Sequence, residues 1–600
     1  MNVKYFFRII ALVFFGMSLQ AQTYVNTRQT LQTAINAAVP GSTIIVRNGT
    51  YNDFYASVTT KAGTAENPIT IKAETVGGVT LTGDSRFTMK KSEHIKFEGF
   101  VFDCTGSNTL IKLEACNNIR ITRNVFELDT PVAIKWIVVV GTFDDYTFQF
   151  LSHHNRIDHN TFKNKFTGGN FITIDGTYNQ DRSIGKQSQY DRIDHNYFYN
   201  NSPRAVNEKE SIRIGNSQLC NSSGFTTVEF NLFEECDGDP EIVSVKSNDN
   251  FIKHNTFNRN HGTLTLRQGN NSRVEGNYFF GGGKANGMLD TQPIYTGGIR
   301  AYGTDHVIIN NYMEGLQGTV WDAPITLTQG EVITGQSTNT SLHYRGERIT
   351  IAYNTLVNNA YGIEIGYTKA DGSYNKKLSN IKIANNLIVG SQNQLVKFYA
   401  DQQGAVTWAN NIMYATGTAQ ILTGVAAYTP SAFTPSQVLV QNPNIALSGT
   451  IWKSTSTSPV IANGIPALTV GQDIDGQTRP ELSNAGADHF STEMVTYLPV
   501  GIPDVGPNSP EESLSVIKSD FPTIVLYPNP TKGNFELTLP ETQKELDIQV
   551  FSIRGQKISE GTYPAISGKI QLNLDNQPAG MYIVKVNSEG KTANYKVIKQ

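Results

Sequence analysis

The sequence predicts an all-β protein, in which a right-handed parallel β-helix is followed by a small C-terminal β-sandwich. The main observation is a repeat: a short β-branched strand, an asparagine and an apolar residue two positions later recur through the middle of the chain. The composition agrees, because the 600 residues include 52 glycines and 55 asparagines but only 17% charged residues, unlike helical repeats or coiled coils. A proline-punctuated stretch near residue 498 separates this region from short alternating strands over residues 522–600.

The composition also excludes several classes of protein. A hydrophobic fraction of 39%, with 10% aromatic residues, is enough to build a core, which argues against disorder. The formal charge of −3 excludes a globally basic nucleic-acid binder. A polyanionic partner would therefore have to be held by a local basic site.

The N-terminus has the features of a secretory signal. Lys4 and Arg8 precede an apolar run over residues 9–19, which ends in Gln20-Ala21-Gln22, so residues 1–21 form the expected signal peptide. The run is shorter than the roughly 20 residues that a membrane span needs. We therefore expect an exported mature chain without a membrane span. Its cysteines would meet an oxidising compartment, and the sequence leaves their pairing open: Cys104, Cys116, Cys220 and Cys236.

The repeated asparagines define the β-helix domain, which we place at residues 22–497. They are separated by 36, 36, 35, 24, 22, 34, 43, 32 and 25 residues: Asn124, Asn160, Asn196, Asn231, Asn255, Asn277, Asn311, Asn354, Asn386 and Asn411. A base period of 22–25 residues with insertions is typical of a parallel β-helix with three strands and three turns per coil. We expect each asparagine to adopt a left-handed turn conformation and to bond its counterpart in the next coil. The apolar residue two positions later should stack inward.

Both ends of this solenoid have their own signals. Residues 30–38 form an amphipathic helix with Leu31, Ile35 and Ala38 on one face, which could cover the first coil. Residues 473–480 and 486–488 resemble the closing segment of many secreted polysaccharide lyases.

The C-terminal region is predicted as a linker, residues 498–521, and a β-sandwich, residues 522–600. Its motifs YPNPT (527–531), GMY (580–582) and KVIKQ (596–600) resemble the C-terminal sorting domain of the type IX secretion system. That resemblance implies a secreted or cell-surface protein that passes through the periplasm and meets the type IX machinery. A carbohydrate-binding module is the alternative.

Three charged clusters interrupt strand-like runs of the β-helix, at residues 207–215, 237–247 and 263–269. Asp239 and Glu241 share strand parity, and carboxylate and amide oxygens on neighbouring coils suit Ca²⁺. Lys246 and Arg267 are 21 residues apart, close to one coil, so they could lie side by side. Lys246 follows Glu241 by five residues and would face the opposite side of a straight strand, so a bend must intervene.

These residues resemble polysaccharide lyase family 6, the alginate lyases and chondroitinase B, over roughly residues 23–490. Four pieces of the sequence match: Asn207…Glu210…Arg213, Asp239-x-Glu241, Lys246-Ser247 and Arg267-x-Gly269. The resemblance implies a Ca²⁺ site at Asn207, Asp239 and Glu241. It also implies a Brønsted base at Lys246 and an acid at Arg267, with substrate contacts by Arg213, Glu210 and Gln268. The chain departs from the family in Asp239, where glutamate is more usual, and in Gln268, where many members have histidine.

The implied reaction is β-elimination on a uronate polymer, which gives 4,5-unsaturated ends. The C5 proton is weakly acidic, so a cation and Arg213 would have to neutralise the neighbouring carboxylate. Lysine is a poor base at its usual pKa of about 10.4, and we expect nearby positive charge and partial burial to favour its neutral form. Alginate is the preferred substrate, with specificity depending on loops 178–190 and 281–298.

Three alternatives remain open at this stage. Dermatan or chondroitin sulfate would be cleaved by the same chemistry. An inverting hydrolase would use Asp237 and Asp239 as its acid and base, and a non-catalytic adhesin would use calcium only structurally. The histidines at 154, 159, 195 and 254 are interpreted as structural, because most precede a repeated asparagine.

Overall fold

A computed structural model describes residues 22–600 except 129, 143–147, 149, 182, 391, 426–432, 463–469, 512–524, 530, 539–544, 553–556, 565–568, 579 and 589–590. The predicted signal peptide thus lies outside the described residues. The chain divides into two compact units, residues 1–509 and 510–600. Within the described ranges, no helix combines the length and the hydrophobicity needed to cross a membrane.

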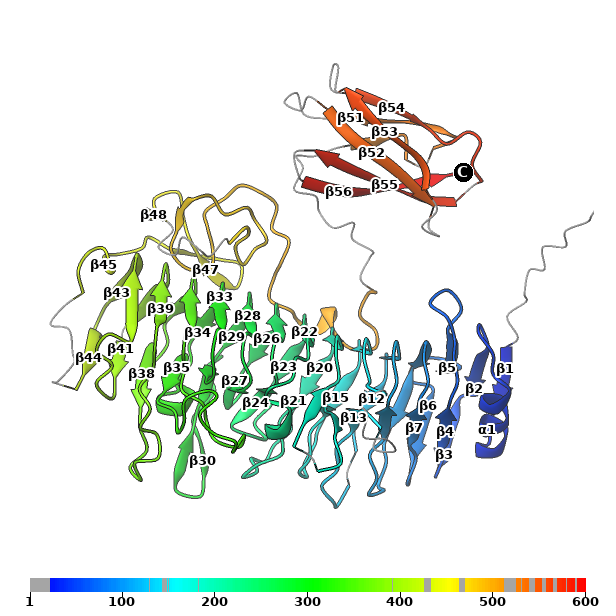
Figure 1. Ribbon diagram of the computed structural model, residues 1–600, viewed down its shortest axis with the longest axis horizontal. Coiled ribbons are helices and arrows are strands. Elements are labelled where there is room, and N and C mark those ends of the chain that lie inside the picture. The colour runs from blue at the N-terminus through cyan, green and yellow to red at the C-terminus, as the bar shows by residue number, and fades with distance from the viewer. Residues whose placement is uncertain are drawn as a thin grey trace, which may run out of the picture. The chain divides into compact units, whose positions relative to one another are not determined.

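The first unit is a solenoid of three parallel sheets, which the chain visits in a fixed order in every coil (Figure 1). The first sheet contains β1 (Gln22–Val25), β2 (Thr43–Val46), β5 (Ile69–Ala73), β8 (Ile95–Glu98), β11 (Arg120–Thr122), β14 (Arg156–Asp158), β19 (Arg192–Asp194), β22 (Thr227–Glu229), β25 (Phe251–Lys253), β28 (Arg273–Glu275), β33 (Val307–Ile309), β36 (Thr350–Ala352), β39 (Ile381–Ala384) and β42 (Val406–Ala409).

The second sheet contains β3 (Gly49–Asn52), β6 (Val79–Thr82), β9 (Phe100–Phe102), β12 (Val125–Phe126), β15 (Thr161–Lys163), β20 (Tyr197–Tyr199), β23 (Leu232–Glu234), β26 (Thr256–Asn258), β29 (Tyr278–Phe280), β34 (Tyr312–Glu314), β37 (Thr355–Val357), β40 (Leu387–Gly390), β43 (Asn411–Ala415) and β45 (Val438–Val440).

The third sheet, called the site sheet below, contains β4 (Ala56–Thr59), β7 (Phe87–Lys90), β10 (Ile111–Glu114), β13 (Ile137–Val140), β16 (Ile172–Ile174), β21 (Ile212–Gly215), β24 (Glu241–Lys246), β27 (Gly262–Gln268), β32 (Thr296–Ala301), β35 (Ile325–Thr328), β38 (Ile363–Tyr367), β41 (Gln394–Phe398) and β44 (Gln420–Gly424). The predicted β-helix is therefore confirmed. The two loops expected to govern specificity contain short hairpins, β17 (Gly176–Tyr178) with β18 (Gly185–Gln187) and β30 (Gly287–Leu289) with β31 (Gln292–Ile294).

The predicted asparagine ladder is present, with one correction. Each ladder asparagine is buried and bonds the next: in Asn160, both the backbone N–H and Nδ2 donate to Oδ1 of Asn196, each at 3.0 Å. The left-handed conformation, however, belongs to the preceding residue, such as His159 (φ 53°) or His195 (φ 52°). The asparagine must turn its amide into the stack to bond its counterpart, so the outward residue before it takes the strained conformation.

The apolar residue two positions after each asparagine stacks inward as predicted. Phe162 lies over Phe198 with ring centroids 5.0 Å apart and planes 7° apart, and Phe198 lies over Phe233 at 4.7 Å. The outward histidines also stack: His159 lies 5.0 Å from His195. These contacts agree with a structural role for the turn histidines.

The first coil is covered as expected. The helix α1 (Arg28–Ala37) begins at a capping box on Thr27 and buries Leu31 and Ile35 in the solenoid core. All four cysteines are buried free thiols, so the structure contains no disulfide among them.

The segment after β45 runs back along the solenoid (Figure 1). It contains two short hairpins, β46 (Ala446–Ser448) with β47 (Ile451–Lys453) and β48 (Val460–Ala462) with β49 (Leu482–Asn484). The predicted linker is wrong in its first half, because residues 498–509 belong to this unit. Val500 and Val505 are buried against Leu232, and the Val500 N–H donates to the Thr256 hydroxyl at 2.7 Å. The prolines of residues 498–509 therefore lie in a segment that packs against the solenoid, and not in a flexible linker.

The second unit consists of two antiparallel sheets, β50 (Val525–Tyr527), β51 (Asn534–Thr538) and β54 (Lys569–Asn573), and β53 (Lys557–Pro564), β52 (Glu545–Ser552), β55 (Gly580–Ser588) and β56 (Lys591–Lys599). One core draws on both sheets, with Phe535 and Leu572 from the first and Val550 and Val584 from the second. This is the β-sandwich that the alternating strands predict.

Candidate functional site

The outward face of the site sheet carries the polar residues of the predicted site. Arg213 of β21 pairs in register with Ser244 of β24, which pairs with Thr265 of β27, which pairs with Arg300 of β32. Their strand neighbours point inward; Val243 and Val245 flanking Ser244, for example, are fully buried in the core. Strand alternation thus brings charged groups from successive coils onto one face.

Two irregularities in β24 and β27 give the bend that the sequence requires but does not locate. Glu241 pairs with Thr263 and Val243 with Leu264, so Ile242 is an extra residue of β24. This β-bulge puts Glu241 and Ser244 on the same face, where the Ser244 hydroxyl donates to the Glu241 carboxylate.

The second irregularity lies beside Lys246. Val245 pairs with Leu266 but Lys246 pairs with Gln268, so Arg267 is an extra residue of β27. The bulge therefore places Arg267 next to Lys246 on the adjacent coil. The predicted pair of basic residues is brought together in this way.

Three carboxylates from two coils gather on one side of this pair. Asp239 lies in the loop before β24, where its carboxylate accepts the N–H groups of Lys209 at 3.3 Å and Glu241 at 3.0 Å. Burial, together with the charges of Glu210 and Glu241, raises the pKa of Asp239 to about 8. Burial alone would raise the pKa of Glu241 as well, but Lys246, Arg300 and Arg267 outweigh it and lower that pKa.

Each of the two central bases faces one of these carboxylates at a distance longer than a close ion pair. Nζ of Lys246 lies 3.7 Å from Oε1 of Glu210, whose other oxygen accepts Nδ2 of Asn170 at 2.5 Å. Nε of Arg267 lies 3.7 Å from Oε1 of Glu241. The buried NH1 of Arg267 has no hydrogen-bond acceptor among the described residues.

Arg213 is held at the edge of the same cluster. Its NH2 lies 3.6 Å from Oδ2 of Asp175, and its NH1 lies 4.0 Å from Glu208. The other oxygen of Asp175 accepts the Tyr178 hydroxyl and Nδ2 of Asn216, both at 2.8 Å. The Arg213 Nε is buried and finds no acceptor within the described part of the chain. An anion bound here would satisfy it.

The donor set fits a hard cation in charge and chemistry. Asp239, Glu241 and Glu210 supply carboxylate oxygens, and the raised pKa of Asp239 reflects repulsion that a cation would relieve. Asn207 lies in the exposed loop that precedes Glu210. Among the described residues, however, no group of three or more His, Cys, Asp or Glu side chains is arranged so that it could hold a metal ion.

Several residues considered from sequence have other partners. Gln268 is only 1% exposed and donates Nε2 to the Thr340 carbonyl, so it braces a loop. Lys209 is buried and donates to the Pro203 carbonyl at 2.7 Å. Asp237 pairs with Lys284 at 2.6 Å and accepts the His261 N–H at 2.7 Å. Burial would raise the pKa of Asp237, but these partners lower it to about 2.

Two further residues of the site were not found from sequence. Arg300 reaches the cluster from the next coil, with NH2 3.3 Å from the hydroxyls of Thr263 and Thr265. Like Arg267, Arg300 is a single charged residue within a strand-like apolar run, here between Ile299 and Ala301. An insertion between the two arginines lengthens their separation beyond one coil, so the sequence spacing does not show that they lie on neighbouring coils. His343 comes from a distant loop; burial and the charge of Arg267 lower its pKa to about 4, and no local motif marks it.

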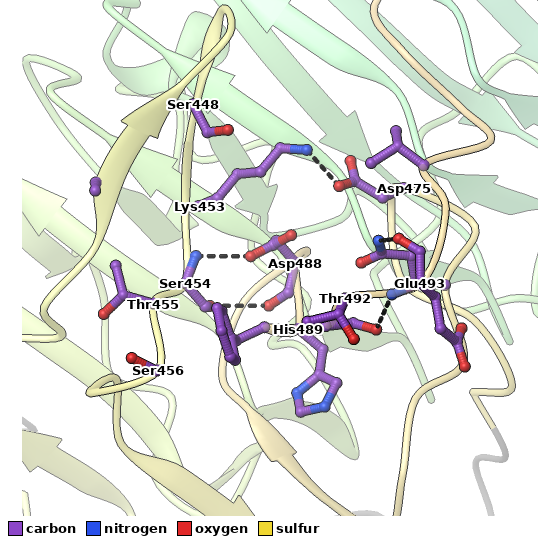
Figure 2. Close-up of a pocket in the computed structure, with 15 residues that line it drawn as sticks. Ser448, Lys453, Ser454, Thr455, Ser456, Asp475, Asp488, His489, Thr492 and Glu493 are labelled. Atoms are coloured by element: carbon purple, nitrogen blue, oxygen red, sulfur yellow. Dashed lines mark hydrogen bonds and ion pairs between the residues drawn. The ribbon is translucent and has the colours of Figure 1, made fainter.

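A separate polar pocket of about 440 Å³ is built from residues 446–495 of the closing segment (Figure 2). Its polar groups serve internal contacts: Lys453 pairs with Asp475, Asp488 accepts the Ser454 N–H at 2.6 Å, and Glu493 accepts the Thr478 N–H at 2.8 Å. It shares no residue with the cluster around Lys246. We interpret these contacts as structural, because they stabilise the conformation of the closing segment.

The fold and site together define a class: parallel β-helix proteins with a buried carboxylate cluster beside paired basic residues on one sheet face. Within this class, the chain belongs to the chondroitinase B family, polysaccharide lyase family 6, whose profile matches residues 25–437. Residues 525–600 match the secretion system C-terminal sorting domain, which implies secretion or a place at the cell surface.

Several known proteins resemble this chain. The solved alginate lyase AlyGC of family 6 is 27% identical, with a TM-score of 0.61 over 81% of this chain and 58% of that one. An alginate lyase called AlyF-OU02, at 19% identity and a TM-score of 0.57 over 81% and 94% of the two chains, shows the shared fold. The ulvan lyase NLR42 of Nonlabens ulvanivorans is 30% identical over 138 residues, 22% of this chain and 25% of that protein. The chain thus spans a quarter of this relative and less than two thirds of AlyGC.

Proposed function

We propose that this protein is a secreted, calcium-dependent polysaccharide lyase that cleaves a uronate polymer, with alginate as its main substrate. The observation that carries the proposal is the set of basic groups facing three carboxylates, two of them buried, across two coils. Lys246 and Arg267 lie side by side through a β-bulge, and both Arg213 and Arg267 have a buried N–H without an acceptor in the described chain. Such unsatisfied donors suit an anionic substrate.

Arg213 would bind the uronate carboxylate next to the proton to be removed. Removing that proton adds negative charge beside the carboxylate, so a fixed guanidinium lowers the barrier. Asp175, held by Tyr178 and Asn216, keeps this guanidinium in place.

Lys246 would take the C5 proton. The C–H electrons form the C4–C5 double bond, and the bond from C4 to its bridging oxygen breaks. Arg267 would stabilise or protonate this oxygen, and because a guanidinium is a reluctant acid its role is mainly electrostatic. The product carries a 4,5-unsaturated uronate at its new non-reducing end.

Calcium would be held by Asp239 and Glu241, with Glu210 and Asn207 as neighbouring oxygen donors. When bound, it would supply positive charge to the substrate carboxylate and to the acidic cluster. Glu210 also faces Nζ of Lys246 at 3.7 Å, so this carboxylate connects the proposed cation donors to the proposed base. We expect EDTA to abolish turnover, and undiminished activity in EDTA would remove the cation from the proposal.

Alginate is preferred because solved proteins of this fold, AlyGC and AlyF-OU02, are named alginate lyases. The decisive experiment is a panel of poly-mannuronate, poly-guluronate, mixed alginate, dermatan sulfate, chondroitin sulfate and ulvan, read by ultraviolet absorbance of unsaturated ends. Release of reducing ends without that absorbance would mean hydrolysis and would refute the lyase mechanism.

Dermatan or chondroitin sulfate is the second candidate within the same family and chemistry. The inverting hydrolase is disfavoured by Asp237. Both oxygens of its carboxylate are engaged, one by the Lys284 ammonium and the other by the His261 N–H, so it is poorly placed to activate a water.

A further inference from the structure

We propose that a cavity at the carboxyl end of the site sheet is a distal subsite, which binds an acidic sugar of the polymer away from the cleavage point. This inference rests on the proposed function, because it assumes that Lys246 and Arg267 act on the same chain. The cavity has a volume of about 920 Å³, which lies within the usual range for ligand pockets.

The cavity is built from three insertions into the coils. Its walls are the β17–β18 hairpin, the turn around the 3₁₀ helix η1 (Ser217–Leu219) and a loop that includes Thr338 and Thr340. Each insertion follows a strand of the site sheet. The cavity therefore borders the sheet that carries the site.

Two contacts join the cavity walls to the central cluster. On one side, Tyr178 of the hairpin donates to Asp175, which lies 3.6 Å from Arg213. On the other side, Thr340 of the loop accepts a hydrogen bond from Gln268, the neighbour of Arg267 in the chain. The same elements thus shape the cavity and position the arginines.

The chemistry of the lining suits an anionic sugar. Lys186 is its one cation, and none of the described residues that line it is acidic. Amide groups come from Gln189, Gln218 and Asn221, and these can bond sugar hydroxyls from either side. The side chain of Phe225 adds an apolar surface.

Lys186 is free to receive a carboxylate. Its ammonium lies 5.0 Å from the centroid of the Phe148 ring, and no ion pair joins it to any described carboxylate. The pocket of the closing segment differs in both respects, since it is lined by Asp475, Asp488 and Glu493 and its lysine is already paired. An acidic polymer would therefore be attracted to the first cavity and repelled from the second.

The test compares wild type, Lys186→Ala and the control Lys382→Ala in the full-length protein with calcium. Lys382 is an exposed lysine on β39 of the first sheet, outside the cavity lining. The substrates are oligomannuronates and oligoguluronates of defined length and the corresponding polymers. We expect Lys186→Ala to raise KM for polymer about two- to fivefold, the range of an exposed ion pair, with a smaller effect on kcat.

The loss should grow with oligosaccharide length, because only longer chains reach both sites. A second variant, Asn221→Ala with Gln218→Ala, should show the same length dependence. A KM for Lys186→Ala equal to that of wild type on every length would overturn the subsite.

Failure of the proposed function is distinguishable from failure of the subsite. Calorimetry with the same oligosaccharides in a Lys246→Ala background measures binding without cleavage. If wild type forms no unsaturated ends but Lys186 still determines the affinity for long oligosaccharides, the subsite stands and the lyase assignment falls. If wild type is active and Lys186→Ala binds as wild type does, the subsite falls alone.

Discussion

Replacing Lys246 by arginine separates the charge of this residue from its ability to accept a proton. Arginine keeps the positive charge opposite Glu210, 3.7 Å away, but its pKa lies above 12, so it does not serve as a base near neutral pH. If Lys246 removes the C5 proton, Lys246→Arg should lose nearly as much activity as Lys246→Ala.

The expected magnitudes follow from the surroundings of the side chain. General base catalysis contributes about 10²–10⁴-fold, so we expect kcat to fall by this factor, about 3–5 kcal/mol in activation free energy. The side chain is 18% exposed and its one ion pair is loose, so the free energy of unfolding should change by less than about 1 kcal/mol.

The assay is the initial rate of ultraviolet absorbance on alginate, with thermal unfolding measured on the same samples. Lys253→Arg is the matched control: Lys253 lies seven residues further on, in β25, and pairs with Glu229 at 3.0 Å on a different sheet. It should retain full activity. Activity of Lys246→Arg within tenfold of wild type, with Lys246→Ala inactive, would show that charge rather than proton removal matters, and the base assignment would be wrong.

Three further predictions concern the scaffold and the edge of the site. Asn196→Ala should lower the free energy of chemical unfolding by about 3 kcal/mol, because the Asn196 amide bonds Ile157, Asn160 and Asn231 in the buried ladder. The control Asn108→Ala, at an exposed position, should leave that free energy almost unchanged. Asp175→Asn should raise KM more than it lowers kcat, since Arg213 loses its anchor, and equal kinetics to the hairpin control Asp181→Asn would contradict this. Burial raises the pKa of Asp488 to about 7, above its unfolded value, so its contribution to stability is lost as pH rises through 7. Asp488→Asn should therefore melt about 2–4 °C higher than wild type at pH 8, and the difference should shrink as pH falls from 7 and vanish below about pH 4, the ordinary pKa of an unfolded aspartate.

Most of the solenoid was predictable from the repeat. One local pattern indicates the length of each coil, the asparagine that bonds the next coil and the apolar residue that stacks in the core. Asn160, for example, is recognised by its spacing, bonds Asn196 and is followed by the stacked Phe162. The position of the left-handed residue was not predictable in this way. It depends on the direction in which the asparagine amide must point to reach the next coil. That direction is set by the stacking of neighbouring coils, which the local sequence of one coil does not contain.

The site was predictable where its residues follow the strand period and unpredictable where they break it. Arg213 is outward by simple alternation. Glu241 and Lys246 share a face only through the extra residue Ile242, and no residue type at that position marks a bulge. Likewise, His343 reaches Arg267 from a loop 76 residues further on, and only the folded chain shows that approach.

The ion pairs of the site differ from those of the scaffold in a way that agrees with function. On the first sheet, Arg120 and Asp158 lie 2.6 Å apart and Arg192 and Glu229 lie 2.7 Å apart, which are the distances of close ion pairs. The three pairs of the site, at Arg213, Lys246 and Arg267, are 3.6–3.7 Å apart.

At these longer distances, both the basic and the acidic partner remain able to interact with a bound ligand. Buried N–H groups of Arg213 and Arg267 lack acceptors within the described ranges, while Asp239 remains in a cluster of like charges that raises its pKa. A protein built only for stability would close such pairs or replace them with apolar residues. An anion on the arginines and a cation on the carboxylates would together satisfy these groups, and this imbalance is the reason why we propose both ligands for this face.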